Sequence, residues 1–367
     1  MRHPISHCCT LRRVPAPSLE VQENVALAPL TTLGIGGPAR FFTEIRAEAE
    51  LLSATAFARE NHLPLFTLGG GSNLLIADSG FPGLVLHLTL TFPIESSRGP
   101  RYVELRAPAG LEWDDLVLFT CNLGLSGMEC LAGIPGLTGG APIQNIGAYG
   151  QEVSQTIQSV RALDLQTGHF VELSNEDCRF SYRSSLFNST ARGRYIVTAI
   201  NFRLLTDAKP NLTYADLARR FAGQQPTPLD VYHAVREIRR GKGMLLTPGE
   251  PDCCSAGSFF KNPLITTQQF AALAESLQLE PPQIPHWPVP GTSPGVKLAA
   301  AWLIEQAGFE KGFSLGNAGV SSRHTLALIN RGHATYADLT GLRDRIRSEV
   351  HSRFRITLEQ EPIELGS

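Results

Sequence analysis

Two glycine-dense segments constrain the fold of this chain more than any other feature. The first, "TLGGGSNLLIADSG" at 67–80, follows a short apolar run that we expect to be a strand. The second, "AGIPGLTGGAPIQNIGAYG" at 132–150, contains six glycines and shows no hydrophobic period. Glycine has no Cβ, so its backbone N–H groups can approach a phosphate closely, but ordering such a flexible loop costs conformational entropy. Two such loops therefore predict a dinucleotide, bound through its pyrophosphate between two subdomains.

A simpler explanation stays open for the first segment, since three glycines also suit a tight turn between strands. Ser72 and Asn73 would add side-chain hydrogen-bond donors if this loop binds an anion. Neither segment has the GxGxxG spacing that opens a Rossmann helix or the GxxxxGK[ST] spacing of a P-loop. The nucleotide site that we expect is consequently of another type.

The overall composition narrows the possible partners. With 32 basic against 34 acidic residues the formal net charge is -2, so no net field attracts nucleic acid or an anionic membrane. No apolar run approaches the ~20 residues that span a bilayer, and the N-terminal residues lack the apolar core of a secretory signal. The seven cysteines include no CxxC pair, which argues against a zinc or dithiol centre. We expect a reduced, cytoplasmic, monomeric protein that binds no metal, no nucleic acid and no membrane.

Helical and strand-like patterns alternate along the chain, which is typical of an α+β or an α/β fold. The stretch 157–204 contains three segments rich in valine and isoleucine that we expect to be strands. Thr227 with Pro228 is typical of a helix start, and Thr335 with Asp338 resembles the capping box of a second, long helix. The remaining predictions are helices over 267–278 and 296–308, a proline-rich loop over 279–294 and a terminal strand over 355–365.

Taken together, these blocks resemble a known family. The two glycine segments, preceded by "TLGIGGPAR", are similar to the FAD-binding part of UDP-N-acetylenolpyruvoylglucosamine reductases, which has the vanillyl-alcohol-oxidase (PCMH) type of fold. The resemblance continues in order through "CRFSYRSSLF", "LTYADL", "IRRGKG", "AGSFFKNP", "GVKLAAAWLIEQAG" and "LEQEP". It implies an α+β chain with two FAD-binding subdomains and a C-terminal α/β substrate-binding domain. The implied boundaries are an N-terminal extension over 1–22, a first FAD-binding subdomain over 23–95 joined by 353–367, a second over 96–228, and the substrate-binding domain over 229–352.

The resemblance also implies the reaction and the cofactors. Members of the family bind FAD, here without a covalent link, and use NADPH to reduce the enolpyruvyl ether of a UDP-sugar to a lactyl ether for peptidoglycan synthesis. Addition of a hydride to C3 of the enolpyruvyl group leaves an enolate-like charge over C2 and the carboxylate, which needs cations or donors nearby. The implied FAD contacts are Gly69, Gly70, Gly71, Ser72, Asn73, Gly136, Gly139, Gly140, Asn145, Gly147, Ala148 and Tyr149.

Three residues are implied as catalytic. Ser258 in "AGSFFKNP" matches the acid that protonates C2, while Arg183 in "FSYRSS" and Glu361 in "LEQEP" match the groups that hold the substrate carboxylate. Glu361 must be protonated, or share a proton, to donate a hydrogen bond, and a raised pKa in a dry pocket would allow this. Pro362 follows where the family often has valine, and it restricts Glu361 to extended backbone. Taken alone, Arg183 could equally be a surface ion-pair partner.

Further polar residues are implied around the UDP part of the substrate. Tyr214 in "NLTYADL" matches a tyrosine on a loop that, in one of the family's two classes, closes over the diphosphate. By itself, Tyr214 could simply be an aromatic residue that packs at the start of a helix. The other implied substrate contacts are Arg239, Lys242, Lys261, Asn262 and Lys297. After Lys242, "KGMLLTPGEPD" is longer and richer in glycine than the family's usual segment.

Two other functions fit parts of the sequence. An FAD-dependent oxidase of the same fold is the nearest alternative, although neither glycine segment contains the histidine through which such enzymes frequently tether FAD. A nucleotide-binding module without catalysis is the second. The adjacent Cys253 and Cys254 have no partner pattern, and we assign them no role.

Overall fold

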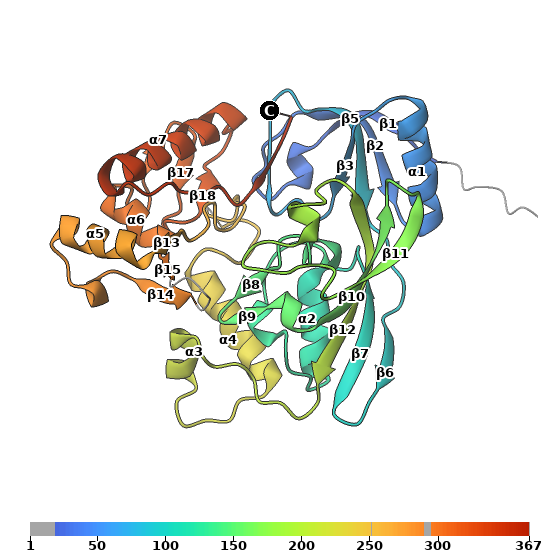
Figure 1. Ribbon diagram of the computed structural model, residues 1–367. Coiled ribbons are helices and arrows are strands. Elements are labelled where there is room, and N and C mark those ends of the chain that lie inside the picture. Colours follow the sequence, from blue (N-terminus) through green and yellow to red (C-terminus); the bar gives the residue numbers. More distant parts are fainter. Residues whose placement is uncertain (1–18, 251, 290–294, 367) are drawn as a thin grey trace, which may run out of the picture.

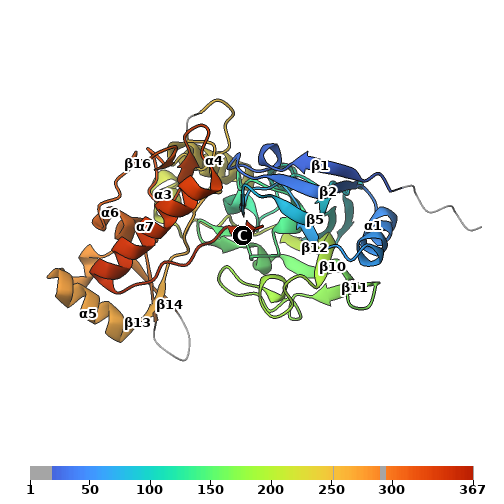
Figure 2. The same cartoon turned by 90° about the horizontal axis from the view of Figure 1, so that it is seen from above.

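The structure is a computed structural model that describes residues 19–250, 252–289 and 295–366. Figure 1 shows an N-terminal unit in blue, a central unit in cyan to yellow and a C-terminal unit in orange and red. Seen from above in Figure 2, the C-terminal unit lies on one side and the two sheet-based units on the other. Residues 1–18 of the expected N-terminal extension lie outside the described residues, whereas Leu19 and Val21 pack against the core of the first unit.

The first unit contains five strands: β1 (Gln22–Ala26), β2 (Pro38–Ile45), β3 (Leu65–Leu68), β4 (Leu74–Ile76) and β5 (Phe81–Leu88). Four of them form a sheet in the order β1-β2-β5-β3, in which β2 and β3 both run parallel to β5. Parallel neighbours need a crossover, and helix α1 (Glu48–Glu60) supplies it between β2 and β3. Leu51 of α1 is buried in one cluster with Leu84 and Leu86 of β5, so the helix covers one face of the sheet. The first glycine segment leaves this sheet at the end of β3.

The second unit is built on an antiparallel sheet of five strands in the order β11-β10-β12-β7-β6. These strands are β6 (Glu95–Arg98), β7 (Tyr102–Pro108), β10 (Ile157–Asp164), β11 (His169–Ser174) and β12 (Tyr195–Leu205), and a short hairpin is formed by β8 (Gly147–Ala148) and β9 (Gln151–Glu152). The three strands predicted within 157–204 are confirmed as β10, β11 and β12. The second glycine segment runs from the region after α2 (Trp113–Asn122) into the β8–β9 hairpin.

Helix α4 (Pro228–Gly241) starts as its sequence predicts, because the side chain of Thr227 caps its first turn. Its buried residues Val231 and Val235 lie in the same core as Trp113 of α2 rather than in the core of the C-terminal unit. We therefore place α4 with the second unit, although the boundary expected after residue 228 assigns it to the substrate-binding domain. The spacing of its apolar residues defines a buried face but not which core that face meets.

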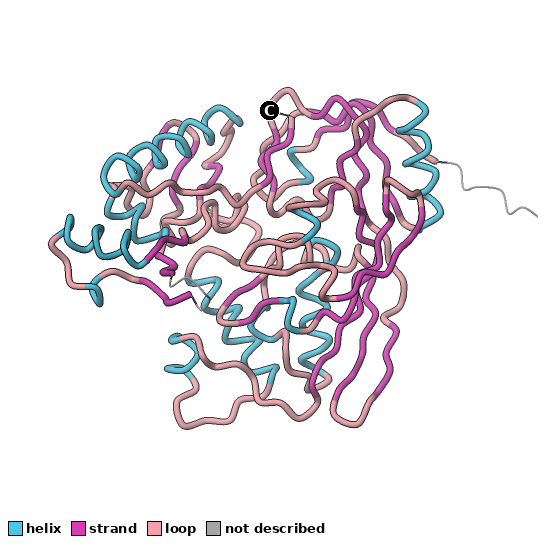
Figure 3. Tube along the Cα trace, viewed as in Figure 1, coloured by secondary structure: helices cyan, strands magenta, loops and turns pink. Residues whose placement is uncertain are grey.

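The C-terminal unit combines three helices with two small antiparallel sheets, β13-β15-β14 and β16-β17-β18 (Figure 3). Its elements are β13 (Leu264–Thr266), α5 (Thr267–Leu277), β14 (His286–Val289), β15 (Gly295–Leu298), α6 (Ala300–Gln306), β16 (Ser314–Leu315), β17 (Ala318–Val320), β18 (Leu328–Asn330) and α7 (Tyr336–Phe354). Helix α7 begins at the capping box that Thr335 and Asp338 predict. The predicted helix over 267–278 is confirmed as α5.

Two predictions for this unit are wrong in part. The helix expected over 296–308 begins only at Ala300, because the residues before it form β15. The proline-rich loop expected over 279–294 contains β14, which pairs antiparallel with β15; its last residues, 290–294, lie outside the described residues. The two errors have one cause, since β14 and β15 form one sheet with β13, and this pairing is not visible in the local sequence.

The end of the chain crosses from the C-terminal unit back to the first unit. Strand β19 (Ile363–Leu365) pairs in parallel with β4, and the chain end marked C in Figure 1 lies beside the first sheet. This strand is shorter than the one expected over 355–365, within which Gln360 makes an isolated bridge to Phe260. The residues just before β19 are thereby held between the units.

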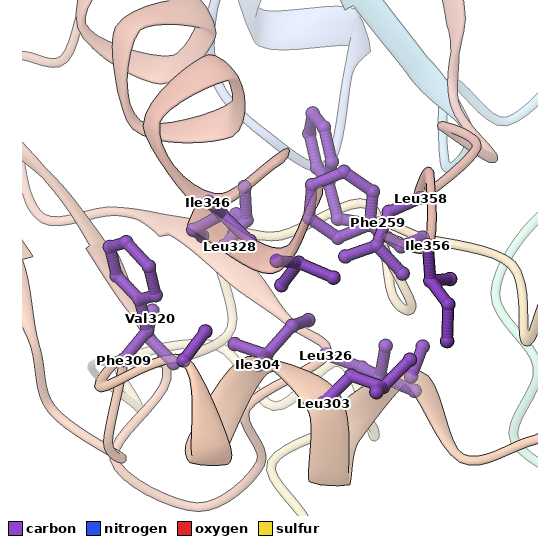
Figure 4. Packing of buried hydrophobic residues seen from close by; sticks show 14 of the residues in the cluster. Phe259, Leu303, Ile304, Phe309, Val320, Leu326, Leu328, Ile346, Ile356 and Leu358 are labelled. Atoms are coloured by element: carbon purple, nitrogen blue, oxygen red, sulfur yellow. The ribbon is translucent and has the colours of Figure 1, made fainter. Parts of the chain in front are cut away.

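Apolar side chains from several segments meet in the core of the C-terminal unit (Figure 4). Phe259 is completely buried there with Leu303 of α6, Ile346 of α7 and Leu358. Truncation of such a phenylalanine to alanine typically costs ~3–5 kcal/mol of stability. Because Ser258 directly precedes Phe259, this packing fixes the backbone from which the Ser258 side chain extends.

Candidate active site

The two glycine segments meet at the floor of a cleft of ≈ 850 Å³, whose walls come from all three units. A Cβ atom on Gly70 would lie 2.7 Å from Cα of Gly136, so only glycine permits this approach. The Ser72 hydroxyl donates a hydrogen bond of 2.9 Å to the carbonyl of Pro135, which joins the two loops at the same place. Gly136 itself has a φ of 119°, a conformation that residues with a side chain rarely adopt.

Part of this floor is open to the cleft. A Cβ atom on Gly69 or on Gly140 would meet no protein atom within 4 Å, and both residues line the cleft. Bare backbone that faces free space from two glycine loops is a surface that a pyrophosphate can approach closely. The size and the lining of the cleft fit a dinucleotide of the size of FAD.

Asn73 connects this floor to the end of the chain. Its side-chain amide donates to Oε1 of Gln144 (2.7 Å) and to the carbonyl of Glu361 (3.4 Å). Its own carbonyl accepts a hydrogen bond of 2.9 Å from the amide of Ile363. A residue of the first glycine segment therefore positions both the second glycine segment and the segment that carries Glu361.

Arg183 and Glu361 form an ion pair in the wall of the cleft. Nε of Arg183 lies 3.0 Å from Oε1 of Glu361, and the two side chains are only 19% and 10% exposed. The guanidinium also donates from Nη2 to the carbonyl of Gly147 (2.8 Å). The N–H direction at Nε does not point at the carboxylate, so this buried atom has a charged neighbour but no hydrogen-bond acceptor. A buried donor without an acceptor is costly, which is typical of a site that receives an anionic ligand.

Burial raises the pKa of the Glu361 carboxyl, and it outweighs the opposing attraction of the Arg183 and Lys261 charges. The group consequently keeps its proton to a higher pH than an ordinary glutamic acid. A neutral carboxylic acid can donate a hydrogen bond, whereas a carboxylate can only accept one. Glu361 is therefore suited to sit beside a second carboxylate.

Ser258 lines the same cleft and is held next to the Glu361 segment by backbone hydrogen bonds. The amide of Glu361 donates to the carbonyl of Phe259, and the amide of Lys261 donates to the carbonyl of Glu359, each at 2.9 Å. Gly257, with a φ of 71°, makes the turn that precedes the serine. The structure thus brings Ser258, Arg183 and Glu361 to one cleft from three distant parts of the chain.

Several predicted cofactor contacts are not part of the cleft lining. Gly139, Ala148 and Tyr149 are not among its lining residues, and neither is Asn145, which is fully buried. The side chain of Asn145 donates to Oε2 of Glu152 (2.9 Å) and to the carbonyl of Ser181 (3.0 Å). In this structure Asn145 supports the shape of the second glycine segment rather than facing the cleft.

Of the six predicted substrate contacts, two line the cleft and four do not. Arg239 and Lys261 line the cleft, but Arg239 is buried and its guanidinium donates to the carbonyls of Gly133 (2.9 Å) and Met244 (2.8 Å). Lys261 is paired with Glu359. The other four predicted contacts, Tyr214, Lys242, Asn262 and Lys297, are not among the residues that line the cleft.

Asn262 has a partner within the C-terminal unit, whereas Lys297 contacts one aromatic residue of that unit and one of the second unit. Oδ1 of Asn262 accepts a hydrogen bond of 2.9 Å from the amide of Ala300, at the start of α6. Nζ of Lys297 lies 4.9 Å from the ring centre of Tyr182 and 5.7 Å from that of Trp287. Burial lowers the pKa of Lys297, and the nearby Arg183 charge acts in the same direction.

The comparisons with known proteins cover almost the whole chain. Residues 39–174 match the FAD binding domain family, and residues 250–365 match the family described as UDP-N-acetylenolpyruvoylglucosamine reductase, C-terminal domain. The chain is 44% identical to the UDP-N-acetylenolpyruvoylglucosamine reductase of Streptomyces coelicolor, over 96% of this chain and 93% of the relative. It is 43% identical to that of Thermobifida fusca, over 94% of this chain and 97% of the relative.

This chain belongs to the UDP-N-acetylenolpyruvoylglucosamine reductase family. A solved structure of such a reductase, from Thermus caldophilus, matches the fold with a TM-score of 0.64 at 27% identity, over 95% of this chain and 99% of that one. The chain thus has the FAD-binding domain and the C-terminal domain of the family, with the mixture of helices and strands that the sequence predicts.

Sequence reasoning missed other residues that line the cleft of this reductase. Those with a charged or amide side chain are Gln144, Asn188, Arg192, Arg343, Arg347, Glu359, Gln360 and Glu364. Arg343 on α7 donates from Nη1 to Oε1 of Gln360 (2.9 Å) and to Oε1 of Glu364 (2.6 Å). A charged residue on a long helix gives no local signal that it lines a cleft, because most such residues face solvent. Gln144 did carry a signal, as a polar residue inside the second glycine segment.

Two negative findings apply to the described part of the chain. No helix there has both the length and the apolar composition required to cross a membrane. No group of three or more His, Cys, Asp or Glu side chains there is arranged to hold a metal ion.

Proposed function

We propose that this reductase uses NADPH to reduce UDP-N-acetylenolpyruvoylglucosamine to UDP-N-acetylmuramate, with FAD bound non-covalently in the cleft. One observation carries the proposal: a buried arginine and a glutamate with a raised pKa face the same cleft as Ser258, beside two glycine loops. An enolpyruvyl group has a carboxylate next to the carbon that must be protonated. The three side chains supply a cation, a hydrogen-bond donor and a hydroxyl for these two positions.

The glycine loops are the proposed site of the cofactor. Gly69 and Gly140 present open backbone to the cleft, and Ser72 and Asn73 hold the two loops together. Bound there by the two loops, FAD would supply the hydride-transfer chemistry between NADPH and the substrate. The protein's part is to orient the reacting groups and to stabilise the charge that develops.

Arg183 and Glu361 are proposed to hold the substrate carboxylate. Nε of Arg183 has no hydrogen-bond acceptor among the residues that the structure describes, and a carboxylate provides one. The raised pKa of Glu361 favours its neutral form, which can donate a hydrogen bond to the other carboxylate oxygen. Both interactions strengthen as negative charge accumulates on the enolate-like state, and such differential binding lowers the barrier.

Ser258 is the proposed proton donor to C2. An alcohol is a weak acid in water, but the carbon that it faces would be strongly basic in a site from which water is excluded. The backbone of this residue is fixed by the burial of Phe259 and by the hydrogen bonds to the Glu361 segment. Such fixing keeps a proton donor in one orientation, as acid catalysis requires.

The diphosphate and sugar of the substrate would extend toward the C-terminal unit. We assign their recognition to Tyr214, Arg239, Lys242, Lys261, Asn262 and Lys297. In the structure Arg239 and Lys261 line the cleft, and Lys242 is a cation close to Tyr214. A phenol and an ammonium group can both bind phosphate oxygens.

Stopped-flow spectroscopy of the flavin tests the proposal. Under anaerobic conditions, NADPH is expected to bleach the absorbance of the FAD-loaded enzyme, and the enolpyruvyl UDP-sugar is expected to restore it. An NADH arm measures the nucleotide preference. Reoxidation by oxygen that is faster than reoxidation by the enolpyruvyl substrate would overturn the proposal in favour of an FAD-dependent oxidase. A protein that binds FAD but is not bleached by either nucleotide would also overturn it.

A further inference from the structure

Lys242 is enclosed by three side chains at the side of the cleft. Its Nζ lies 3.2 Å from Oδ2 of Asp216 and 3.3 Å from the hydroxyl of Tyr214. The same ammonium lies 5.2 Å from the ring centre of Tyr214 and 5.5 Å from that of Tyr149, and these two rings meet edge to face at 4.9 Å. None of these four side chains belongs to the described lining of the cleft.

Two helices bring these side chains together. Tyr214 is the residue before helix α3 (Ala215–Arg220), Asp216 lies in the first turn of that helix, and Lys242 follows the last residue of α4. Helices α3 and α4 lie side by side in Figure 1. The contacts of Lys242 therefore connect the segment that carries Tyr214 to a helix of the second unit.

The ion pair between Lys242 and Asp216 is weak enough for another anion to replace Asp216 at Lys242. The two side chains are 29% and 34% exposed, so water and salt screen their attraction and the pair contributes little to stability. Burial acts to lower the pKa of Lys242, but the neighbouring tyrosines and Asp216 outweigh it and raise the pKa, so the group is charged at neutral pH. Asp216 has a second cation at hand, since Nη2 of Arg219 lies 3.6 Å from its Oδ1.

We propose that Asp216 occupies the place of the ligand's diphosphate at Lys242 and Tyr214, and that it thereby sets the affinity of the enzyme for nucleoside-diphosphate ligands. The inference rests on the proposed assignment of Lys242 and Tyr214 to the diphosphate. One oxygen of the Asp216 carboxylate already accepts a hydrogen bond from the Lys242 ammonium, as a phosphate oxygen would, and the same ammonium donates to the Tyr214 hydroxyl. A bound diphosphate must displace the carboxylate from Lys242, because the two anions repel each other. Asp216 then keeps Arg219 as its partner.

Binding of UDP to the FAD-loaded enzyme, measured by calorimetry, tests the inference. Asp216→Asn is expected to bind UDP about two- to fivefold more tightly, which is the scale of an exposed ion pair. It is also expected to lower KM for the UDP-sugar with little change in kcat. Glu237→Gln is the matched control, because Glu237 of α4 pairs with Arg220 of α3 and its loss removes the same charge without touching Lys242. The control is expected to bind UDP as the parent does.

A double-mutant cycle separates this inference from the proposed function. Lys242→Ala is expected to weaken UDP binding, and in that background Asp216→Asn is expected to bring no gain. If Lys242→Ala alone leaves UDP binding unchanged, the assignment of Lys242 to the diphosphate fails, and the proposed function loses that residue. If Lys242→Ala weakens binding but Asp216→Asn binds no better than the parent, or gains as much as Glu237→Gln, the role given to Asp216 is overturned.

Discussion

Glu361 places a carboxyl group in a dry part of the cleft, beside a guanidinium that favours its charged form. Burial prevails, so the pKa of Glu361 in the folded protein lies above its ordinary value. The folded state therefore binds this proton more tightly than the unfolded state does. The resulting contribution to stability is complete below the ordinary glutamate range and is lost as the pH rises through the raised pKa.

A pH series of urea unfolding measures this effect. Relative to Glu361→Gln, which stays neutral, the parent protein is expected to lose unfolding free energy as the pH rises from about 5 to 8, at up to about 1.4 kcal/mol per pH unit of the range in which the group titrates. Any difference in stability between a neutral carboxylic acid and an amide at this position adds an offset that does not change with pH. A difference between the two proteins that is flat across this range would show that Glu361 ionises as an ordinary carboxyl.

Ser258 is expected to act in one half of the reaction only. Ser258→Ala should leave the bleaching of the flavin by NADPH nearly unchanged, because no proton donor at C2 is needed there. Its reoxidation by the enolpyruvyl substrate should slow by ~10²- to 10⁴-fold, the usual contribution of a positioned acid. Ser258→Cys keeps a proton donor and should retain more of this rate than alanine does. Equal losses in both halves for Ser258→Ala would mean that the residue only shapes the cleft.

At the scale of elements, the glycines of the two loops differ in what an added side chain would meet. Gly70 and Gly136 are required by the contact between the loops, whereas Gly69 and Gly140 face the open cleft. Gly69→Ala and Gly140→Ala are therefore expected to fold with the melting temperature of the parent apoprotein. Their affinity for FAD should fall by about tenfold or more, since a methyl group now stands where the ligand approaches the backbone.

Fluorescence titration of each apoprotein with FAD checks this prediction. Gly341→Ala is the control, because a Cβ there also meets no atom within 4 Å and the residue lies on exposed α7, away from the cleft lining. It should bind FAD normally and gain roughly 0.5–1 kcal/mol of stability, as alanine does in a helix. FAD affinity in Gly69→Ala and Gly140→Ala equal to that of the control would place the cofactor elsewhere.

Helices whose ends are marked by nearby capping residues could be predicted from the sequence. Strands that depend on pairing with a distant segment could not. Thr227 and Thr335 cap their helices through side-chain hydrogen bonds within four residues, and the sequence therefore located both helix starts. Lys297 lies in β15 although the residues around it continue a helical pattern, because pairing with β14 determines its conformation. Sequence analysis did not predict β14 because this strand contains Pro288, and proline usually argues against a strand.

At the scale of the whole molecule, the cleft depends on the end of the chain, where β19 pairs with β4 of the first unit. Ser258, Arg183 and Glu361 could be named from the family's motifs, but nothing in the local sequence places them together. Their arrangement depends on the bond between the amide of Ile363 and the carbonyl of Asn73, which ties the chain end to the first glycine loop. Long-range pairing of this kind has no period or spacing that a sequence displays.

Removal of the last strand tests how far the units depend on one another. A chain ending at Pro362 keeps Glu361 but loses β19, and with it the pairing to β4 and the contacts of Glu364 with Arg343 and Tyr336. We expect a melting temperature lower by at least about 4 °C, which corresponds to ~3 kcal/mol or more in a protein of this size, and FAD affinity reduced by about tenfold or more. Differential scanning calorimetry with and without FAD measures both effects.

A chain that lacks only residue 367 is the control, and it should melt and bind FAD as the parent does. If the longer truncation behaved like this control, the cleft would be held by the first two units alone, and the return of the chain would serve only to deliver Glu361.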